Sequence, residues 1–191
     1  HASMRRLRTD YIDLYQIHHS DPLTGLEDTL RALDDLVRAG KVRYIGCSNL
    51  PAWQLMKALA ISKEQYLERF RCTQSYYSLV GRELEREMVP LLKDQAVGLL
   101  VWSPLAGGFL SGKFTREDGD EQARRTKFDF PPLDKGKGFA IVDVMRAIAG
   151  RRGATVAQIA LQWVLANDVV TSVIIGVRNI AQLDDNLKSI D

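Results

Sequence analysis

Residues Trp102–Lys113, with the sequence WSPLAGGFLSGK, follow the apolar run Val97–Val101. The apolar run predicts a buried strand, and the residues after it predict a glycine-rich loop that closes with a lysine. Glycine lets a backbone approach a ligand closely. Backbone N–H groups in such a turn, together with a lysine, suit a phosphate group. A surface loop at the end of a strand is an equally good reading of these residues alone.

The rest of the chain alternates predicted strands with predicted helices. A helical stripe of apolar residues follows the first strand at Leu26, Leu30, Leu33 and Val37, and Gly40 is expected to end that helix. Strands joined by helices run parallel. The pattern fits an open doubly wound sheet or a (β/α) barrel, and no G-x-G-x-x-G follows the first strand, which disfavours a Rossmann domain. The five expected strands are Tyr11–His18, Val42–Cys47, Cys72–Tyr77, Val97–Trp102 and Ser172–Ile175.

Helix boundaries in the second half rest on local signals. Thr155 and Gln158 form a capping box, and Asn179 is expected to cap a last helix that buries Leu183 and Leu187. Pro90 lies inside an apolar stripe from Leu84 to Leu92, which predicts a kinked helix. A charged segment over Thr115–Lys137 predicts a long surface loop, and a helix is expected over Phe139–Gly150.

Composition limits the classes of function. Hydrophobic residues make up 46% of the 191 residues, enough for a sizeable core, and the formal net charge is +2. This charge gives no basis for a nucleic-acid or polybasic membrane partner. No apolar run reaches the roughly 18 residues of a membrane span, and no signal peptide is visible, so a cytoplasmic location is expected. Cys47 and Cys72 suggest neither a disulfide framework nor a metal site and are expected to be buried thiols.

Polar groups stand at the ends of the predicted strands, where ligand groups gather in parallel α/β folds. Each has a structural alternative: a satisfied core histidine, a turn before Pro51, an internal hydrogen bond, simple packing as assumed for Trp53 and Trp163, or a solvated arginine. Five such groups at equivalent places nevertheless indicate one site. They are His18, Ser48 with Asn49, Gln74, Trp102 with Ser103, and Gly176 with Arg178.

Three stretches carry a resemblance to a known family. Thr9–His18, TDYIDLYQIH, is similar to the aldo-keto reductase motif that contains the active-site histidine. Gly40–Asn49, GKVRYIGCSN, resembles the motif whose Ser-Asn pair binds the nicotinamide carboxamide, and Trp102–Gly108 with Gly112-Lys113 resembles the pyrophosphate loop. The resemblance runs in order along essentially the whole chain. It implies a (β/α)8 barrel of TIM type that uses NADP(H) to reduce aldehydes or ketones to alcohols.

The same resemblance implies a role for each matching residue. His18 would orient the carbonyl substrate, and Trp102 would stack on the nicotinamide ring. An arginine that opens a helix suits a ribose 2′-phosphate, which favours NADP over NAD. The carboxamide would be held by Ser48, Asn49 and Gln74, the pyrophosphate by Ser103, Leu105, Gly107 and Lys113, and the adenosine end by Gly176, Arg178, Gln182 and Asn186.

The resemblance also implies missing parts. In the family the His18 strand is the fourth of eight, so residues 1–191 are expected to form one N-terminally truncated domain of about five βα units, an incomplete barrel without the catalytic Asp, Tyr and Lys. Little reductase activity is therefore expected, and exposed barrel edges favour self-association. A non-catalytic NADP(H)-binding regulatory module resembling potassium-channel β subunits is the alternative. An isomerase-like barrel is disfavoured by Trp102 and the Ser48-Asn49 pair.

Overall fold

The computed structural model describes residues 1–116 and 128–190. Five strands form a parallel sheet in the order β1-β2-β3-β4-β5 and alternate with helices, consistent with part of a (β/α) barrel. The predicted strands are confirmed, with ends that differ by at most two residues. The strands are β1 Ile12–Ile17, β2 Val42–Ser48, β3 Phe70–Tyr76, β4 Gly98–Trp102 and β5 Val170–Ile174.

The described helices are of ordinary length, and none combines the extent and apolar character needed to cross a membrane. The α-helices are α1 Ala2–Leu7, α2 Leu26–Arg38, α3 Ala52–Glu64, α4 Met88–Gln95, α6 Lys135–Arg152, α7 Val156–Leu165 and α8 Ile180–Leu187. Among the described residues, three short 3-10 segments are η1 Glu83–Glu85, η2 Ala106–Ser111 and η3 Lys188–Ile190.

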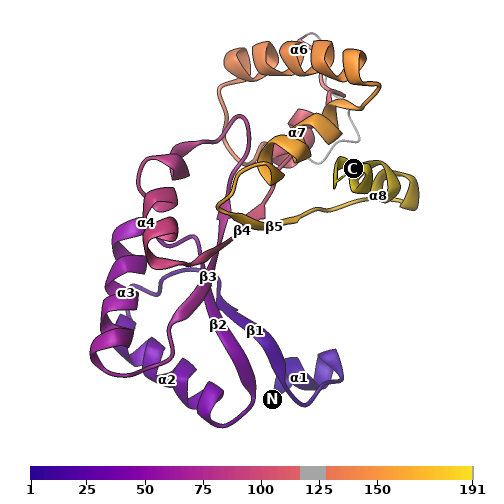
Figure 1. The fold of residues 1–191 in the computed structure, drawn as a ribbon. Coiled ribbons are helices and arrows are strands. Elements are labelled where there is room, and N and C mark those ends of the chain that lie inside the picture. Colours follow the sequence, from indigo (N-terminus) through magenta and orange to yellow (C-terminus); the bar gives the residue numbers. More distant parts are fainter. Residues whose placement is uncertain (117–127, 191) are drawn as a thin grey trace. The chain divides into compact units, whose positions relative to one another are not determined.

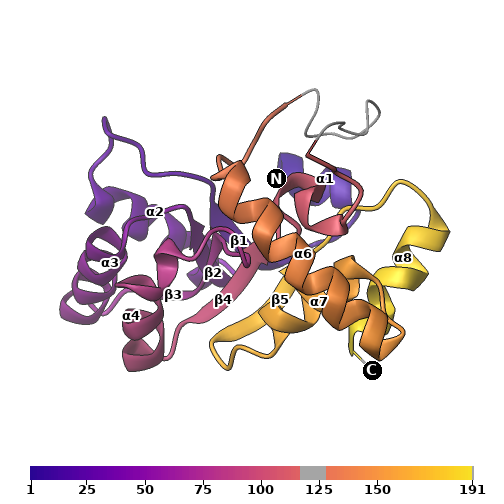
Figure 2. The same cartoon turned by 90° about the horizontal axis from the view of Figure 1, so that it is seen from above.

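The described residues divide into two compact units, which we treat separately. Unit 1 comprises residues 1–75 and 86–99. Its strands β1, β2 and β3 carry α2, α3 and α4 on one side (Figure 1 and Figure 2). The apolar stripe of α2 is confirmed, since Leu30 and Leu33 are buried, and the helix ends just before Gly40, whose φ of 67° is left-handed. Leu30, Ile45, Leu55 and Phe70 are fully buried and form the centre of this core.

Unit 2 comprises residues 76–85 and the described residues from 100 onward. Helices α6 and α7 lie side by side (Figure 2) and pack on η2, the short segment after β4. The core they share contains Ala106, Phe109, Leu110, Val142, Met145, Ile159 and Ala160. The segment after β4 is therefore held by buried apolar contacts.

The expected kink at Pro90 is wrong. Helix α4 begins at Met88, so Pro90 lies in its first turn, and Leu84 belongs to the separate segment η1. A proline in the first turn of a helix removes an N–H group that would have no partner within the helix. The apolar stripe therefore spans two elements, which are separated by Arg86 and Glu87.

Two predicted helix starts are confirmed. Thr155 and Gln158 form a capping box at α7, and the Asn179 side chain accepts a hydrogen bond from the Gln182 amide at α8. Two burial predictions are wrong, because the Leu187 side chain is 49% exposed and Trp53 is 62% exposed.

Helix α6 begins earlier than predicted. It starts at Lys135, inside the predicted Thr115–Lys137 loop, because the Asp134 side chain caps it by accepting a hydrogen bond from the Lys137 amide. The middle of that predicted loop, residues 117–127, lies outside the described residues.

Candidate functional site

Four predicted site residues of unit 1 meet at the carboxyl ends of its strands. Residue Ser48 ends β2 in register with Gln74 on β3, and His18 directly follows β1. The Ser48 hydroxyl donates a hydrogen bond to the Gln74 carbonyl at 2.8 Å, and the Asn49 backbone amide donates to the same carbonyl at 3.1 Å. We call His18, Ser48, Asn49 and Gln74 the amide cluster.

Asn49 connects the ends of the strands. Its backbone has a φ of 58°, a left-handed conformation that asparagine tolerates better than most residues. This turn brings the Asn49 side-chain Nδ2 to 3.0 Å from the Ser48 hydroxyl and 3.2 Å from the His18 carbonyl. Ser48 is only 3% exposed, so the cluster rests on the buried sheet.

The His18 side chain is exposed and lies against the neighbouring His19 ring. The two ring centroids are 4.1 Å apart with an interplanar angle of 61°. The imidazole is thus accessible to small molecules while its main chain is held by Asn49. This combination suits a group that contacts a reactant.

Residue Gln16, which the motif comparison did not single out, joins the amide cluster. Its side-chain oxygen accepts a hydrogen bond from the Gln74 side-chain nitrogen at 3.1 Å. A signal for it was present in the sequence, because Gln16 precedes His18 by two positions on a strand and alternate residues of a strand share a face. A polar residue two positions before a site histidine is therefore a candidate for the same site.

In unit 2, Trp102 ends β4 within a group of aromatic rings. Its indole and the Tyr76 ring have centroids 5.1 Å apart and planes inclined by 33°. The Phe130 ring stacks on the same indole with centroids 5.7 Å apart and an angle of 9°. Neither Tyr76 nor Phe130 was singled out from the sequence, although Tyr76 follows Gln74 by two positions on the same strand. The indole is half-buried in this group.

The loop after Trp102 contains four residues with a left-handed backbone. Ser103, Ala106, Gly107 and Gly108 have φ values of 53°, 49°, 65° and 95°. The Ser103 hydroxyl accepts a hydrogen bond from the Gly107 amide at 2.9 Å, and the Ser103 carbonyl accepts one from the Ala106 amide at 2.8 Å. A Cβ built at Gly108 would have no heavy atom within 4 Å, so the backbone is open to a neighbour there. The amides of Ala106, Gly107 and Gly108 are thus engaged within the loop itself, since the Gly108 amide donates to the Leu105 carbonyl at 2.9 Å.

The far end of this loop is anchored by helix α6. One Arg146 guanidinium nitrogen donates hydrogen bonds to the Gly112 carbonyl at 2.9 Å and the Phe114 carbonyl at 3.2 Å. Between them, the Lys113 side chain is exposed. The loop therefore has a fixed backbone from Leu105, whose carbonyl accepts from the Gly108 and Leu110 amides, to Phe114.

The remaining predicted residues of unit 2 lie just before α8 and along it. Gly176 and Arg178 are exposed. The Arg178 backbone amide donates to the Gln182 side-chain oxygen at 2.9 Å, so the Gln182 amide takes part in the helix cap. Asn186 is only 8% exposed and lies mainly inside the unit. Of these four residues, Gly176 and Arg178 are therefore the most accessible.

Two further features bear on chemistry. Burial raises the pKa of the Cys47 thiol to about 12, so it is protonated at neutral pH. Within residues 1–116 and 128–190, no cluster of His, Cys, Asp or Glu side chains is arranged to hold a metal ion.

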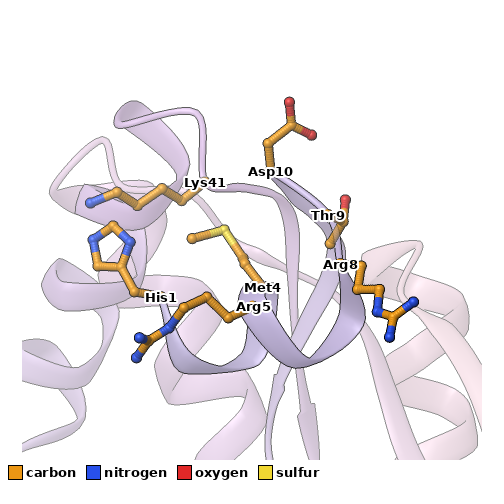
Figure 3. Close-up of a pocket in the computed structure, with 7 residues that line it drawn as sticks. All are labelled: His1, Met4, Arg5, Arg8, Thr9, Asp10 and Lys41. Carbon is orange, nitrogen blue, oxygen red and sulfur yellow. The ribbon is translucent and has the colours of Figure 1, made fainter.

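A separate open pocket of about 630 Å³ contains none of the predicted site residues (Figure 3). It is lined by His1, Met4, Arg5, Arg8, Thr9, Asp10 and Lys41.

Comparison with known proteins gives matches along the whole chain. The model of the Aldo/keto reductase family matches residues 1–191. The chain is 38% identical to an uncharacterized oxidoreductase, YrpG, of Bacillus subtilis, covering 100% of this chain and 57% of that protein. It is 34% identical to versiconal hemiacetal acetate reductase of Aspergillus parasiticus, in a match that covers 99% of this chain and 55% of that protein. It is 32% identical to a probable voltage-gated potassium channel subunit beta of Arabidopsis thaliana, in a match that covers 100% of this chain and 60% of that protein. The chain thus spans less than two thirds of each of these relatives.

Proposed function

Because this chain belongs to the aldo/keto reductase family, we propose that it binds NADP(H) as part of an oxidoreductase that reduces aldehydes or ketones to alcohols. The proposal treats residues 1–191 as one domain of this type. It assigns the nicotinamide carboxamide to Ser48, Asn49 and Gln74 and the pyrophosphate to Ser103, Leu105, Gly107 and Lys113.

The observation that carries the proposal is the hydrogen-bonded amide cluster. The Ser-Asn pair of one family motif and Gln74 on the next strand are joined through the Gln74 carbonyl, which accepts from the Ser48 hydroxyl and the Asn49 amide. Donors and acceptors held in this way keep their geometry when a ligand arrives, which lowers the entropy lost on binding.

The chemistry of the residues fits a dinucleotide phosphate. The exposed ammonium of Lys113, which follows the turn from Ser103 to Gly108, is suited to a diphosphate, and the exposed Arg178 guanidinium to a ribose 2′-phosphate. The half-buried indole of Trp102 offers an aromatic surface to a nicotinamide ring. When bound, the cofactor would supply the hydride for carbonyl reduction. The residues of this chain would bind it and orient it.

We assign His18 to orientation of the substrate carbonyl, since its exposed imidazole can donate a hydrogen bond. Reduction also needs a proton for the carbonyl oxygen. No tyrosine of this sequence lies in the family's catalytic-tyrosine motif, so we propose that the 191-residue polypeptide by itself turns over poorly. The activity that we propose it retains is binding of the cofactor.

An NADPH titration followed by fluorescence, with NADH in parallel, tests the proposal on material of confirmed mass. Saturable binding that favours NADPH is expected, and Arg178→Leu should remove the preference while leaving NADH binding unchanged. Arg152→Leu, an exposed arginine at the end of α6, is the matched control. Absence of NADPH binding by the unsubstituted chain would refute the proposal. Rapid NADPH-dependent reduction of a reactive aldehyde would refute the proposed impairment.

The likeness to a probable potassium channel subunit beta favours a second candidate function, a regulatory module that binds NADP(H) without turnover. The two candidates differ in chemistry and not in binding. Steady-state turnover with aldehydes by a protein that saturates with NADPH would favour the reductase. Binding without turnover, even when the polypeptide is extended at its N-terminus to the length of its relatives, would favour the module.

We also propose that the chain self-associates through the edge of its sheet. Strand β1 stands first in the strand order, and among the described residues it pairs only with β2. Open strand edges recruit other strands. Light scattering over a concentration series should show dimers or larger species, and Tyr15→Lys, at an exposed position of β1, should reduce them. A monomer at all concentrations would contradict this proposal.

A further inference from the structure

Three residues on neighbouring strands form one row beneath the amide cluster. Gln16 on β1 pairs in register with Gly46 on β2, and Gly46 pairs with Cys72 on β3. Side chains in register on adjacent strands share a face of the sheet. Ser48 and Gln74, which are also in register with each other, follow Gly46 and Cys72 by two residues on their strands, so the two rows lie on the same face of the sheet.

Gly46 lets the side chain of Gln16 cross the middle strand. A Cβ at position 46 would lie 2.9 Å from the Cys72 sulfur and 3.1 Å from the Gln16 Cγ, closer than side-chain atoms normally approach. The Gln16 amide therefore reaches β3, where its nitrogen lies 3.7 Å from the Cys72 sulfur. Any larger residue at position 46 would require Gln16 or Cys72 to move.

The Gln16 amide fixes the direction of the Gln74 amide. Its oxygen accepts a hydrogen bond from the Gln74 side-chain nitrogen at 3.1 Å. Within the described part of the chain, no donor is bonded to the side-chain oxygen of Gln74. An amide whose nitrogen is engaged in this way holds its oxygen in a fixed direction, where that oxygen can accept a hydrogen bond from a further donor.

We infer that Gln16 is a positioning residue that turns the Gln74 amide so that its oxygen accepts an N–H donor from the ligand. The inference rests on the proposed function, in which Gln74 meets the nicotinamide carboxamide. It adds a selectivity: the site should prefer a primary carboxamide, which has an N–H donor, over an acetyl group, which has the same carbonyl and no such donor.

Three ligands separate this role from a general structural role. They are NADP⁺, its 3-acetylpyridine analogue, which lacks the amide N–H, and adenosine 2′,5′-bisphosphate, which lacks the nicotinamide. Isothermal titration calorimetry on the full chain should give a preference of about three- to tenfold for NADP⁺ over the analogue, the value of one ordinary hydrogen bond. Adenosine 2′,5′-bisphosphate reports whether the rest of the proposed site is intact.

Two kinds of substitution at position 16 make opposite predictions. Gln16→Glu keeps an oxygen that accepts from the Gln74 nitrogen, so the preference should persist. Gln16→Met and Gln16→Leu remove that oxygen, so the preference should fall to near one while binding of adenosine 2′,5′-bisphosphate is unchanged. Gln54→Met is the control in the same unit, because the buried side-chain oxygen of Gln54 has no hydrogen-bond partner in the described residues.

Each outcome has a distinct meaning. If the unsubstituted chain binds NADP⁺ and the Met and Leu variants retain its preference over the analogue, the inference about Gln16 is wrong and the proposed function stands. Equal losses for all three ligands would also overturn it, because they would show a structural role only. If the unsubstituted chain binds neither NADP⁺ nor adenosine 2′,5′-bisphosphate, the proposed function fails and the inference fails with it.

Discussion

The ring of Phe130 is nearly parallel to the indole of Trp102, with an angle of 9° and centroids 5.7 Å apart. Trp102 is itself half-buried, so Phe130 shields the indole from water only in part. Stacked aromatic pairs bury apolar surface and contribute about 0.5–1.5 kcal/mol beyond that burial. The accessibility of Trp102 should therefore depend in part on the Phe130 ring, with Tyr76 as the other aromatic neighbour.

Phe130→Ala is expected to increase quenching of Trp102 fluorescence by acrylamide, because it uncovers part of the indole. Phe128→Ala is the control, since Phe128 contacts the Phe130 ring, with centroids 5.5 Å apart, and should change Trp102 quenching less. The same variants in a Trp102→Phe background assign the signal. Equal quenching in Phe130→Ala and the unsubstituted chain would contradict the observed stack.

Gly81→Ala is expected to destabilise the protein by about 1–3 kcal/mol, the usual result of overpacking. A Cβ at position 81 would lie 2.2 Å from a ring carbon of Tyr76, whose hydroxyl is 2.9 Å from that of Ser78. The Tyr76 ring would have to move, and the hydroxyl contact would be lost. Urea denaturation of the whole chain measures the effect.

Gly150→Ala is the contrasting substitution in the same unit. Gly150 lies within α6, and a Cβ there would have no heavy atom within 4 Å. Alanine in a helix is more favourable than glycine by about 0.5–1 kcal/mol, so an increase in stability is expected. A loss of stability comparable to that of Gly81→Ala would show that space around the Cβ does not determine these effects.

Thr155→Ala should reduce stability by about 0.5–2 kcal/mol through loss of the cap of α7. The Thr155 hydroxyl accepts from the Gln158 amide at 3.2 Å and donates to an Asp185 carboxylate oxygen at 3.1 Å. Thr155→Ser keeps both bonds and should retain most of the stability. Thermal unfolding monitored by circular dichroism distinguishes the variants, and equal losses for Ala and Ser would argue against the capping role.

Asp34 is expected to make stability depend on pH below about 4. Burial of its carboxylate opposes ionisation, but hydrogen bonds from Arg38 and from the Glu68 amide, at 2.7 Å, outweigh this and lower its pKa. The ionised form therefore stabilises the fold above the usual aspartate pKa of about 3.9, and this contribution is lost as the pH falls through the lowered value. Asp34→Asn should cost about 1–3 kcal/mol at pH 7.

The difference between Asp34→Asn and the unsubstituted chain should shrink below pH ~4, because Asp34 itself becomes neutral there. Urea denaturation at a series of pH values measures it. Asp35→Asn, a neighbouring exposed carboxylate in the same helix, serves as the control. A difference that stays constant down to the acid limit would contradict the assignment.

Both cysteines should resist thiol reagents in the folded state. Burial raises the pKa of Cys47 to about 12 and also raises that of Cys72, and the two residues are 0% and 8% exposed. The thiolate is the reactive form. Ellman's reagent at pH 8 should label neither in the native protein and both after denaturation. Rapid labelling of the native protein would show that one thiol is accessible.

Much of the fold follows from local patterns. Alternating and continuous apolar runs located the strands, and the hydroxyl and amide side chains of Thr155 and Asn179 marked helix starts, because these signals depend only on neighbouring residues. Pro90 shows the limit. Its apolar neighbours Leu84 and Met88 lie at helical spacing, yet a helix can begin between them, and spacing alone does not show the break.

Burial and side-chain direction were harder to foresee. Leu187 sits at helical spacing from Leu183 but is half exposed, because burial depends on what packs against a helix. The sequence singled out Gln74 at a predicted strand, but the acceptor that orients its side-chain amide is Gln16, 58 residues earlier. That bond exists because Gly46 leaves space on the strand between them, which is a property of the sheet register.

The anchor from Arg146 to the loop after Trp102 has a consequence for synthesis of the chain. Arg146 follows Gly112 by 34 positions, so a ribosome must complete most of α6 before the carbonyls of Gly112 and Phe114 gain their guanidinium partner. Domains form from the N-terminus onward as the nascent chain emerges. All residues of unit 1 have been synthesised once residue 99 is added. The loop after Trp102, in contrast, gains its Arg146 hydrogen bonds only after α6 has left the ribosomal exit tunnel.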